Sequence, residues 1–393
     1  MNSDNKYLNI KSRRKYFIFI CLYFFLYPIC KLLFGRKKNW IVCERGNDAQ
    51  DNGFLFFKYL IDHHPEIKPV YLINKTSPDY LKVKKIGKVV EFQSFKHFMM
   101  VIGSPVKISS NLFGYAPWVQ MTTYLRRNKT RDINVFLQHG VIKNYHEGLC
   151  SDNCKAIDLF VCGAKPEYDY VLSEFRYNNS VPQYTGFARY DSLEDFKTKN
   201  QILLMPTWRS KLSAISDECF INSDFYKEWV NLINNSKLLE RCKKANLTIK
   251  FYLHYALQNY SHLFKGNEIV KIVNFGEEAV QDLLKESKIL ITDFSSVYFD
   301  FGYMNKPVVY FQFDESTFYD EHYTKGYFDY RRDGFGDVCL KTDETVNSII
   351  KIIDNKFDAE KKYLDRMNTN FVYRDNKNCE RIFNCICELR DKK

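Results

Sequence analysis

Short apolar runs and helix-like stretches alternate along the chain from Trp40 onward. The runs are continuous and rich in Val and Ile, which is typical of parallel strands buried on both faces. The expected strands are WIVCER, PVYLIN, KVVEF, VKISS, NVFLQHG and IDLFVCG in a first half, and ILLMPTW, TIKFYLHY, EIVKIV, KILITD and PVVYFQF in a second half. The expected helices lie at 53–63, 166–176, 225–240, 277–286 and 296–304, with further helices from about residue 344.

This alternation predicts an α/β protein with two doubly wound, Rossmann-like domains that face each other across a cleft. The 393 residues are enough for two domains of ordinary size. A polar stretch at 190–200, YDSLEDFKTKN, is the best candidate for a linker. We therefore expect a first domain at 39–195 and a second domain, with terminal helices, at 196–393.

Residues 1–38 differ in character from the rest of the chain. They contain an apolar core, from Tyr16 to Cys30, which is preceded by Arg13, Arg14 and Lys15 and followed by Arg36, Lys37 and Lys38. This core is shorter than the roughly 18 to 20 residues of a spanning helix. It also lacks the small-residue cleavage site of a signal peptide. Flanking basic residues favour a segment that lies in the anionic cytoplasmic leaflet, and a spanning helix is the alternative.

The N-terminal segment therefore predicts a peripheral or monotopic protein on the cytoplasmic side of the cell membrane. The formal net charge of +11 favours an anionic partner such as nucleic acid, anionic lipid or a phosphorylated substrate. The body matches no nucleic-acid-binding module, so we expect no nucleic-acid partner. The 12 cysteines form no C-x-x-C pair and no zinc spacing with histidine, which indicates reduced thiols.

The stretch ITDFSS ends one expected strand and opens the next helix. Thr292 and Asp293 close the strand, and Ser295 and Ser296 begin the helix. Asp and Ser are favoured helix caps, so a structural role fits these residues. The N–H groups of a helix N-terminus also bind phosphate, and small hydroxyl side chains add donors. From these residues alone, a cap and a phosphate site fit about equally well.

Two histidines follow expected strands, one in each half of the chain. His139 comes after NVFLQ, and His254 comes near the end of TIKFYLHY. A lone histidine at a turn is more often structural, but histidine also serves as a general base near neutral pH. Ligands bind at the carboxyl ends of parallel strands, so both histidines are expected to face one cleft. This pairing favours a functional role for each.

Three basic side chains lie near the same strand ends and are candidates for contact with an anionic ligand. Arg209 follows ILLMPT, Lys143 follows His139, and Lys325 lies in the loop beyond PVVYFQF. A guanidinium suits a diphosphate, whereas an ordinary ion pair is the structural alternative.

The first expected strand is followed by ERGNDAQDNG, whose acidic residues are expected to repel phosphate. Neither a glycine-rich nucleotide loop nor a D-x-D pair that holds a divalent metal is present in the sequence. We therefore expect no metal and no cofactor.

Taken in order, these motifs resemble the CDP-glycerol glycerophosphotransferases of teichoic-acid and capsule-polymer synthesis. The resemblance runs from about Trp40 to Val338 and is strongest in ITDFSSVYFDFGYMNKPVVYFQFD, KGYFDY, GFGDV and PTWR, with QHGVIK, TGFARYDSL and ERGNDAQDNGFLFFKYL in addition. It implies a two-domain fold of the glycosyltransferase B (GT-B) type. It also implies transfer of glycerol phosphate from CDP-glycerol to a hydroxyl of a lipid-linked or polymer acceptor at the membrane, with release of CMP.

The same resemblance implies roles for individual residues. His139 looks like the general base on the acceptor hydroxyl, and His254 looks like a second active-site histidine that binds or protonates the diphosphate. The implied donor-binding residues are Ser295, Ser296, Arg209, Thr292 and Lys325 for the phosphates, and Asp300 and Asp293 for the ribose or polyol. The implied acceptor-side residues are Gly140, Lys143 and Arg189.

Three positions depart from the family pattern. The first histidine begins HGVI where the family has H-G-T-P, Tyr255 stands where proline follows the second histidine, and Ala188 precedes Arg189 where proline is common. These changes border the expected donor and acceptor sites, so CDP-ribitol is an alternative donor. Two further hypotheses stay open: a GT-B glycosyltransferase that uses a UDP- or CMP-activated sugar, and a catalytically inactive membrane-bound scaffold of a capsule-synthesis complex.

Overall fold

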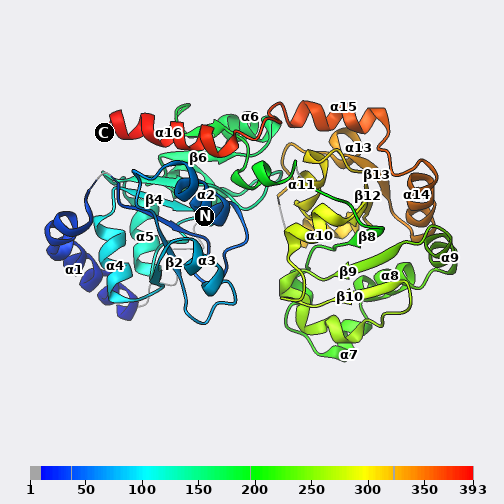
Figure 1. Ribbon diagram of the computed structural model, residues 1–393. Helices are drawn as coiled ribbons and strands as arrows, with labels where there is room; N and C mark the ends of the chain where they lie inside the picture. The colour runs from blue at the N-terminus through cyan, green and yellow to red at the C-terminus, as the bar shows by residue number, and fades with distance from the viewer. Residues whose placement is uncertain (1–9, 37, 195, 322–323, 393) are drawn as a thin grey trace.

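The computed structural model describes residues 10–36, 38–194, 196–321 and 324–392. It contains two parallel sheets, each surrounded by helices, that form two neighbouring domains (Figure 1). The prediction of two parallel-sheet α/β domains is confirmed. Residues 1–9 and Lys37 of the expected membrane segment lie outside the described residues.

The first sheet has the strand order β3-β2-β1-β4-β5-β6-β7, and every neighbouring pair is parallel. Its strands are β1 (Trp40–Cys43), β2 (Val70–Ile73), β3 (Lys88–Glu91), β4 (Val106–Ser109), β5 (Ile133–Phe136), β6 (Leu159–Cys162) and β7 (Pro182–Tyr184). Its helices are α2 (Asn52–His63), α3 (Tyr80–Ile86), α4 (Phe95–Gly103), α5 (Val119–Arg127) and α6 (Lys165–Glu174). All residues of β1, β2, β4, β5 and β6 are buried, as expected for strands that helices cover on both faces.

The second sheet has the order β10-β9-β8-β11-β12-β13 and is also parallel. Its strands are β8 (Gln201–Leu204), β9 (Thr248–Tyr252), β10 (Val270–Val273), β11 (Ile289–Thr292), β12 (Val308–Phe311) and β13 (Gly336–Cys339). Its helices are α7 (Asp217–Ile221), α8 (Asp224–Ile233), α9 (Ser236–Lys244), α10 (Val280–Glu286), α11 (Val297–Tyr303), α12 (Glu315–Glu321), α13 (Tyr330–Asp333), α14 (Thr342–Asp354) and α15 (Lys361–Asn370). In each sheet, successive strands are added first on one side of the first strand and then on its other side, so the strand order reverses at β1/β4 and at β8/β11. In a doubly wound fold this reversal marks the ligand site.

Alternate residues of a strand point to opposite faces of its sheet, and the apolar clusters follow this rule. Ile41 and Cys43 join a cluster confined to the first domain, whereas Trp40 and Val42 join a larger one. This larger cluster continues into the second domain and includes Leu290 of β11. Apolar packing therefore runs through both domains.

Two edge strands and one helix break are the clearest differences from the predicted elements. β7 begins at Pro182 and β13 begins at Gly336, and neither contains the Val- or Ile-rich run used to predict strands. The helix expected at 225–240 is two helices, α8 and α9. The break occurs because the Asn235 side chain accepts a hydrogen bond from the Leu238 N–H and so caps α9.

The chain returns to the first domain at its C-terminus. Helix α16 (Asn378–Lys392), red in Figure 1, lies along the first domain although it falls in the range expected for the second. The Phe383 ring lies 3.5 Å from the His64 ring and 5.7 Å from the Trp40 ring, centroid to centroid. The backbone N–H of Cys379 also donates to Asp191 Oδ2 at 2.8 Å. Two segments therefore connect the domains, one before β8 and one after α15.

Helix α1 (Ile10–Phe34) lies at the outer side of the first domain, away from the second (Figure 1). It is longer than the apolar core seen in the sequence because it continues through Pro28. Among the described residues, Arg13–Phe34 has the length and composition of a membrane-crossing helix. Its Phe19 and Tyr23 side chains are buried against α4 and α5.

Candidate functional site

Most of the predicted site residues follow the carboxyl ends of strands at or next to the two reversal points, whereas Arg189 follows the edge strand β7 and Lys325 lies between α12 and α13. Residues 44–51 follow β1, and His139 follows β5, which pairs with β4. In the second domain, Arg209 lies beyond β8, His254 follows β9, and the ITDFSS stretch follows β11. This arrangement brings strand-end loops from both sheets to the boundary between the domains.

His139 is positioned by an unusual backbone conformation at the preceding residue. Gln138 has a φ of 61°, which a residue with a side chain rarely adopts. Its buried side-chain amide donates to the Val161 carbonyl and to Glu167 Oε1, and its own carbonyl accepts from Asn52 Nδ2 at 2.9 Å. These contacts hold the turn that presents His139 at the end of the strand. Strain of this kind is common at functional sites.

The His139 side chain is accessible to solvent, although protein surrounds much of it. This surrounding protein lowers the pKa of His139 below its ordinary value of 6.5. Asp51 opposes the effect, whereas Arg45 and Arg189 lower the pKa further. A neutral imidazole at physiological pH is the form that a general base requires.

His254 is half-buried between aromatic side chains in the second domain. Its ring lies 6.1 Å from the Trp208 ring at an angle of 17° and 4.5 Å from the Tyr255 ring. Burial lowers its pKa to about 4, with a further contribution from Arg45. Its Nδ1 accepts the Ala256 N–H at 3.3 Å, so the neutral ring carries its proton on Nε2. His254 can therefore donate a hydrogen bond without carrying a charge.

The two domains meet closely beside His139. A Cβ atom built on Gly140 would lie 2.7 Å from Ser296 Oγ, so the first domain closely approaches the start of α11 here. The Lys143 ammonium donates to the Phe294 carbonyl at 2.6 Å. It also lies 5.4 Å from the Tyr298 ring centroid. Gly140 and Lys143 are thus interdomain contacts as well as predicted site residues.

A second part of the interdomain contact involves the loop that carries Lys325. The Tyr145 N–H donates to the Thr324 carbonyl at 3.0 Å. A Cβ atom on Gly326 would lie 2.2 Å from the Lys143 carbonyl oxygen. The Lys325 side chain is 62% exposed, and its ammonium lies 3.8 Å from the Asp329 carboxylate. Its charge is therefore available to a ligand.

The ITDFSS residues divide into a buried structural pair and an accessible pair. Thr292 donates to the Met205 carbonyl at 2.7 Å, and Asp293 accepts from the Thr207 and Phe294 N–H groups. Ser295 and Ser296 are only half-buried. The Ser296 side chain makes no capping hydrogen bond, although it stands at the N-cap of α11. The cap interpretation therefore fails for Ser296, whose hydroxyl is not committed to the helix.

Two of the predicted cations form buried ion pairs with protein carboxylates. Arg209 donates to Asp293 Oδ2 at 2.8 Å and to Asp314 through two nitrogens at 2.7 and 3.0 Å. Arg189 donates to both oxygens of Asp300. The two guanidinium groups and the Asp293 and Asp300 carboxylates are therefore paired with one another and hold the loops of the site in position. The predicted substrate contacts of these four residues stay predictions.

Sequence reasoning missed Arg45, because its loop was expected to repel phosphate. The acidic neighbours are used inside the protein: the buried Glu44 carboxylate accepts from the N–H groups of Gln50, Asp51 and Phe54 at 2.9 to 3.0 Å. Burial raises the pKa of Glu44 to about 8. The Arg45 side chain is 49% exposed, and among the described residues its ion pair is with Asp48, at 3.2 Å.

The Arg45 guanidinium reaches across the domain boundary. It lies 5.2 Å from the ring centroid of Tyr255, the residue after His254. It also lowers the pKa of both His139 and His254, which requires a position near each of them. Its place directly after β1, at the reversal point of the first sheet, is the sequence signal that could have identified it.

This geometry agrees with the comparison to known proteins. A family model described as CDP-Glycerol:Poly(glycerophosphate) glycerophosphotransferase matches residues 26–388. The chain belongs to this family. The resemblance seen in the motifs is therefore confirmed over nearly the whole chain.

Two curated relatives show how the chain compares in length. It is 34% identical over 373 residues to the minor teichoic acid biosynthesis protein GgaB of Bacillus subtilis (strain 168). The aligned region covers 92% of this chain but only 41% of GgaB. It is 25% identical over 377 residues to the teichoic acid glycerol-phosphate transferase of Staphylococcus aureus (strain NCTC 8325 / PS 47), with 83% of this chain and 90% of that protein covered. The chain thus spans under half of one relative and most of the other.

The fold agrees with a solved structure. The wall teichoic acid polymerase TagF superimposes with a TM-score of 0.71 at 14% sequence identity, with 98% of each chain covered. At this identity the likeness establishes the shared fold, which is the GT-B-like arrangement of two α/β domains.

Proposed function

We propose that this family member transfers a polyol phosphate from a CDP-polyol to a hydroxyl of a membrane-linked acceptor and releases CMP. The observation that carries the proposal is the contact between the His139–Gly140 turn of the first domain and Ser296 of the second. It places a neutral histidine next to an uncommitted hydroxyl at a helix start. The first domain supplies His139 as a base for the acceptor hydroxyl, and the second domain supplies hydrogen-bond donors for a phosphate.

The transfer step uses His139 as the general base. A ring nitrogen of His139 takes the proton of the acceptor hydroxyl while the hydroxyl oxygen bonds to the β-phosphorus, which carries the polyol. The bond between that phosphorus and the bridging oxygen breaks, and its electron pair stays on CMP. Positioning and charge stabilisation supply most of the rate in phosphoryl transfer, so the surrounding donors matter as much as the base.

The remaining accessible groups bind the diphosphate in this proposal. The Nε2–H of His254 donates to a phosphate oxygen, and its low pKa favours this binding role over protonation of the leaving group. Ser295, Ser296 and Lys325 supply further donors from the second domain. Arg45 supplies a cation from the first domain and closes the site over the donor. Arg209, Arg189, Asp293 and Asp300 hold these groups in place.

The donor is CDP-glycerol in this proposal, because the description of the matched family names CDP-glycerol. CDP-ribitol is the alternative, since Val141, Ile142 and Tyr255 depart from the family motifs beside both histidines. No divalent metal takes part, because donors and cations of the protein neutralise the diphosphate.

Association with the cytoplasmic side of the membrane completes the proposal. Helix α1 exposes apolar side chains on its outer face, including Phe17 and Phe25. The names of two relatives refer to teichoic acid. The proposed acceptor is therefore a lipid-linked or polymer end at the membrane.

The test measures CMP release and polyol transfer by the full chain with CDP-glycerol, CDP-ribitol and UDP-sugars, with and without EDTA. His139→Ala should lower the rate by at least about 100-fold, the scale of general-base catalysis. His262→Ala is the matched control, because His262 is exposed and pairs with Asp217 far from the site. Release of UDP instead of CMP would replace the proposal with a glycosyltransferase, and unchanged polymer production by His139→Ala would favour a scaffold.

A further inference from the structure

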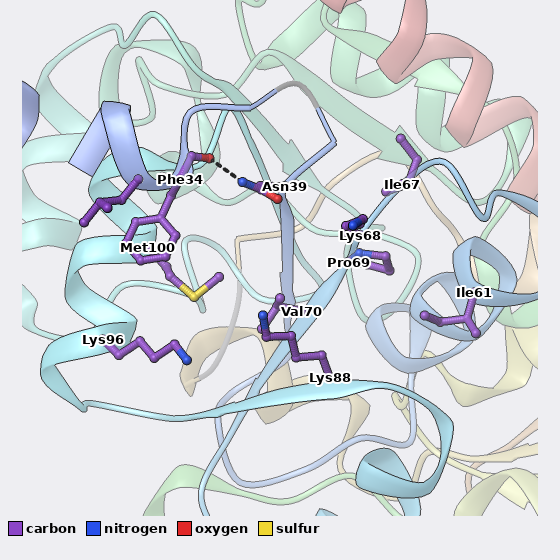
Figure 2. Close-up of a pocket in the computed structure, with 11 residues that line it drawn as sticks. Phe34, Asn39, Ile61, Ile67, Lys68, Pro69, Val70, Lys88, Lys96 and Met100 are labelled. Carbon is purple, nitrogen blue, oxygen red and sulfur yellow. Dashed lines mark hydrogen bonds between the residues drawn. The ribbon is translucent and has the colours of Figure 1, made fainter. Parts of the chain in front are cut away.

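A pocket of about 450 Å³ opens beside the C-terminal end of α1, away from the candidate active site (Figure 2). Its lining combines an apolar wall with three lysines. The apolar residues are Leu33, Phe34, Ile61, Ile67, Pro69, Val70 and Met100, and the polar ones are Asn39, Lys68, Lys88 and Lys96. An apolar wall next to several ammonium groups is suited to a ligand with an apolar chain and an anionic head.

The three lysines come from three different parts of the first domain. Lys68 precedes β2, Lys88 begins β3, and Lys96 lies in the first turn of α4. All three are exposed, and none forms an ion pair with a carboxylate in the part of the chain that the structure describes. In Figure 2 the Lys96 side chain points toward Lys88. Their charges are therefore not neutralised by the protein.

The pocket continues the exposed apolar face of α1. Leu32 is 83% exposed, and its neighbour Leu33 is 53% exposed and also lines the pocket. Phe95, next to Lys96, is 65% exposed. Leu33 therefore connects the exposed apolar residues of α1 to a pocket that also carries the lysines, and this composition suits an interfacial membrane-binding site.

Helix α1 is fastened along the domain in a way that fixes the orientation of this surface. A Cβ atom on Gly103 would lie 2.3 Å from the Cys30 carbonyl oxygen, so α1 and α4 cross in close contact. Lys31 forms an ion pair with the buried Asp132, which also pairs with Lys107 at 2.6 Å. A helix held in this way lies against the protein along its length, with its other face turned outward.

We propose that the pocket binds an anionic phospholipid of the membrane. The lipid phosphate lies between Lys68, Lys88 and Lys96, and an acyl chain follows Leu33, Phe34 and Met100. Helix α1 lies in the plane of the membrane surface beside it. This inference rests on the proposed membrane association and adds the lipid class and the residues that select it.

The test is co-flotation of the full chain with vesicles of phosphatidylcholine alone or of phosphatidylcholine mixed with phosphatidylglycerol. The pocket variant is Lys68→Gln/Lys88→Gln/Lys96→Gln. The matched control is Lys227→Gln/Lys265→Gln/Lys271→Gln, which removes three exposed lysines from the second domain. The pocket variant should bind anionic vesicles more weakly by roughly fivefold per lysine, the scale of one basic residue near an anionic surface. The control and the wild type should bind alike.

The outcomes test the lipid site and the membrane association of the chain separately. Equal binding of all three proteins to neutral vesicles, with a loss on anionic vesicles only for the pocket variant, supports the lipid site. An equal loss for both triple variants, or no loss for either, overturns it. Displacement of the chain from vesicles by inorganic phosphate, at an ionic strength matched with sodium chloride, overturns it in favour of a small-anion site. Failure of the wild type to float with either vesicle overturns the proposed membrane association itself.

Discussion

Arg189 and Asp300 join the two domains through two parallel hydrogen bonds, from Nε to Oδ1 at 2.8 Å and from Nη2 to Oδ2 at 3.0 Å. Both side chains are almost fully buried. The third guanidinium nitrogen, Nη1, donates to Asp51 at 2.9 Å and to the His139 carbonyl at 3.3 Å. One arginine therefore fixes the proposed base relative to helix α11, whose start carries the proposed phosphate donors.

Breaking the Arg189–Asp300 pair should strongly lower the stability of the protein. Asp300→Leu leaves a buried guanidinium with one carboxylate fewer, and the free energy of unfolding should fall by about 3 to 5 kcal/mol. Arg189→Met/Asp300→Leu replaces both partners with apolar groups and should recover much of that loss. Urea unfolding of the two variants and the wild type measures both values. A double variant as unstable as Asp300→Leu would show that the charge pair is not the source of the effect.

Arg45→Gln should lower kcat/KM by roughly 10- to 100-fold, the scale of one hydrogen bond to a charged group. It should also move the acid limb of the pH–rate profile to higher pH. The sign follows because Arg45 lowers the pKa of both histidines, so its removal lets each gain a proton at a higher pH. Arg176→Gln is the control, since Arg176 is exposed and pairs with one aspartate in the same domain. A rate loss without a shift of the acid limb would place Arg45 away from the histidines.

Lys143→Met should stabilise the protein most at low pH. Burial lowers the pKa of Lys143 from 10.5 to about 7, so between these values the unfolded chain binds more protons than the folded one. The contribution of Lys143 to stability therefore rises with pH across this window. The difference in free energy of unfolding, variant minus wild type, should shrink from pH 7 to 10.5. Thermal unfolding of both proteins over this range measures it, with Lys227→Met as the control for loss of an exposed lysine, and a constant difference would contradict the prediction.

Gly326→Ala should loosen the interdomain contact. The added methyl group would meet the Lys143 carbonyl at 2.2 Å, and this backbone atom cannot rotate away. Overpacking of this kind costs about 1 to 3 kcal/mol. Gly148→Ala is the matched control, because a Cβ there meets no atom within 4 Å. Equal melting temperatures for the two variants would show that the loop moves without cost.

Much of the fold could be predicted because the strand signal is local. Runs such as ILI in β11 and VVYF in β12 are apolar at every position, and the structure places each inside a sheet, with a strand on both sides. Strand β13, with Gly336 and Asp337, has no such signal and exists because β12 pairs with it. Tertiary pairing therefore decides the edge strands β7 and β13, whereas the central strands and the edge strands β3 and β10 could be predicted from their apolar runs.

The candidate site could be located from the sequence, but the partners of its charges could not. Arg209 and Asp293 are 84 residues apart, and nothing in either neighbourhood indicates that they pair. The same limit applies to the loop after β1. Counting its carboxylates suggested repulsion of phosphate, whereas Glu44 turns inward to backbone N–H groups and leaves Arg45 at the domain boundary.

The return of α16 to the first domain has a mechanical consequence. Because the chain crosses the boundary twice, the two domains are covalently connected at two places, before β8 and after α15. Two covalent connections allow fewer relative movements of the domains than one connection would. The double connection therefore acts together with the Arg189–Asp300 pair to keep the His139 turn beside the start of α11.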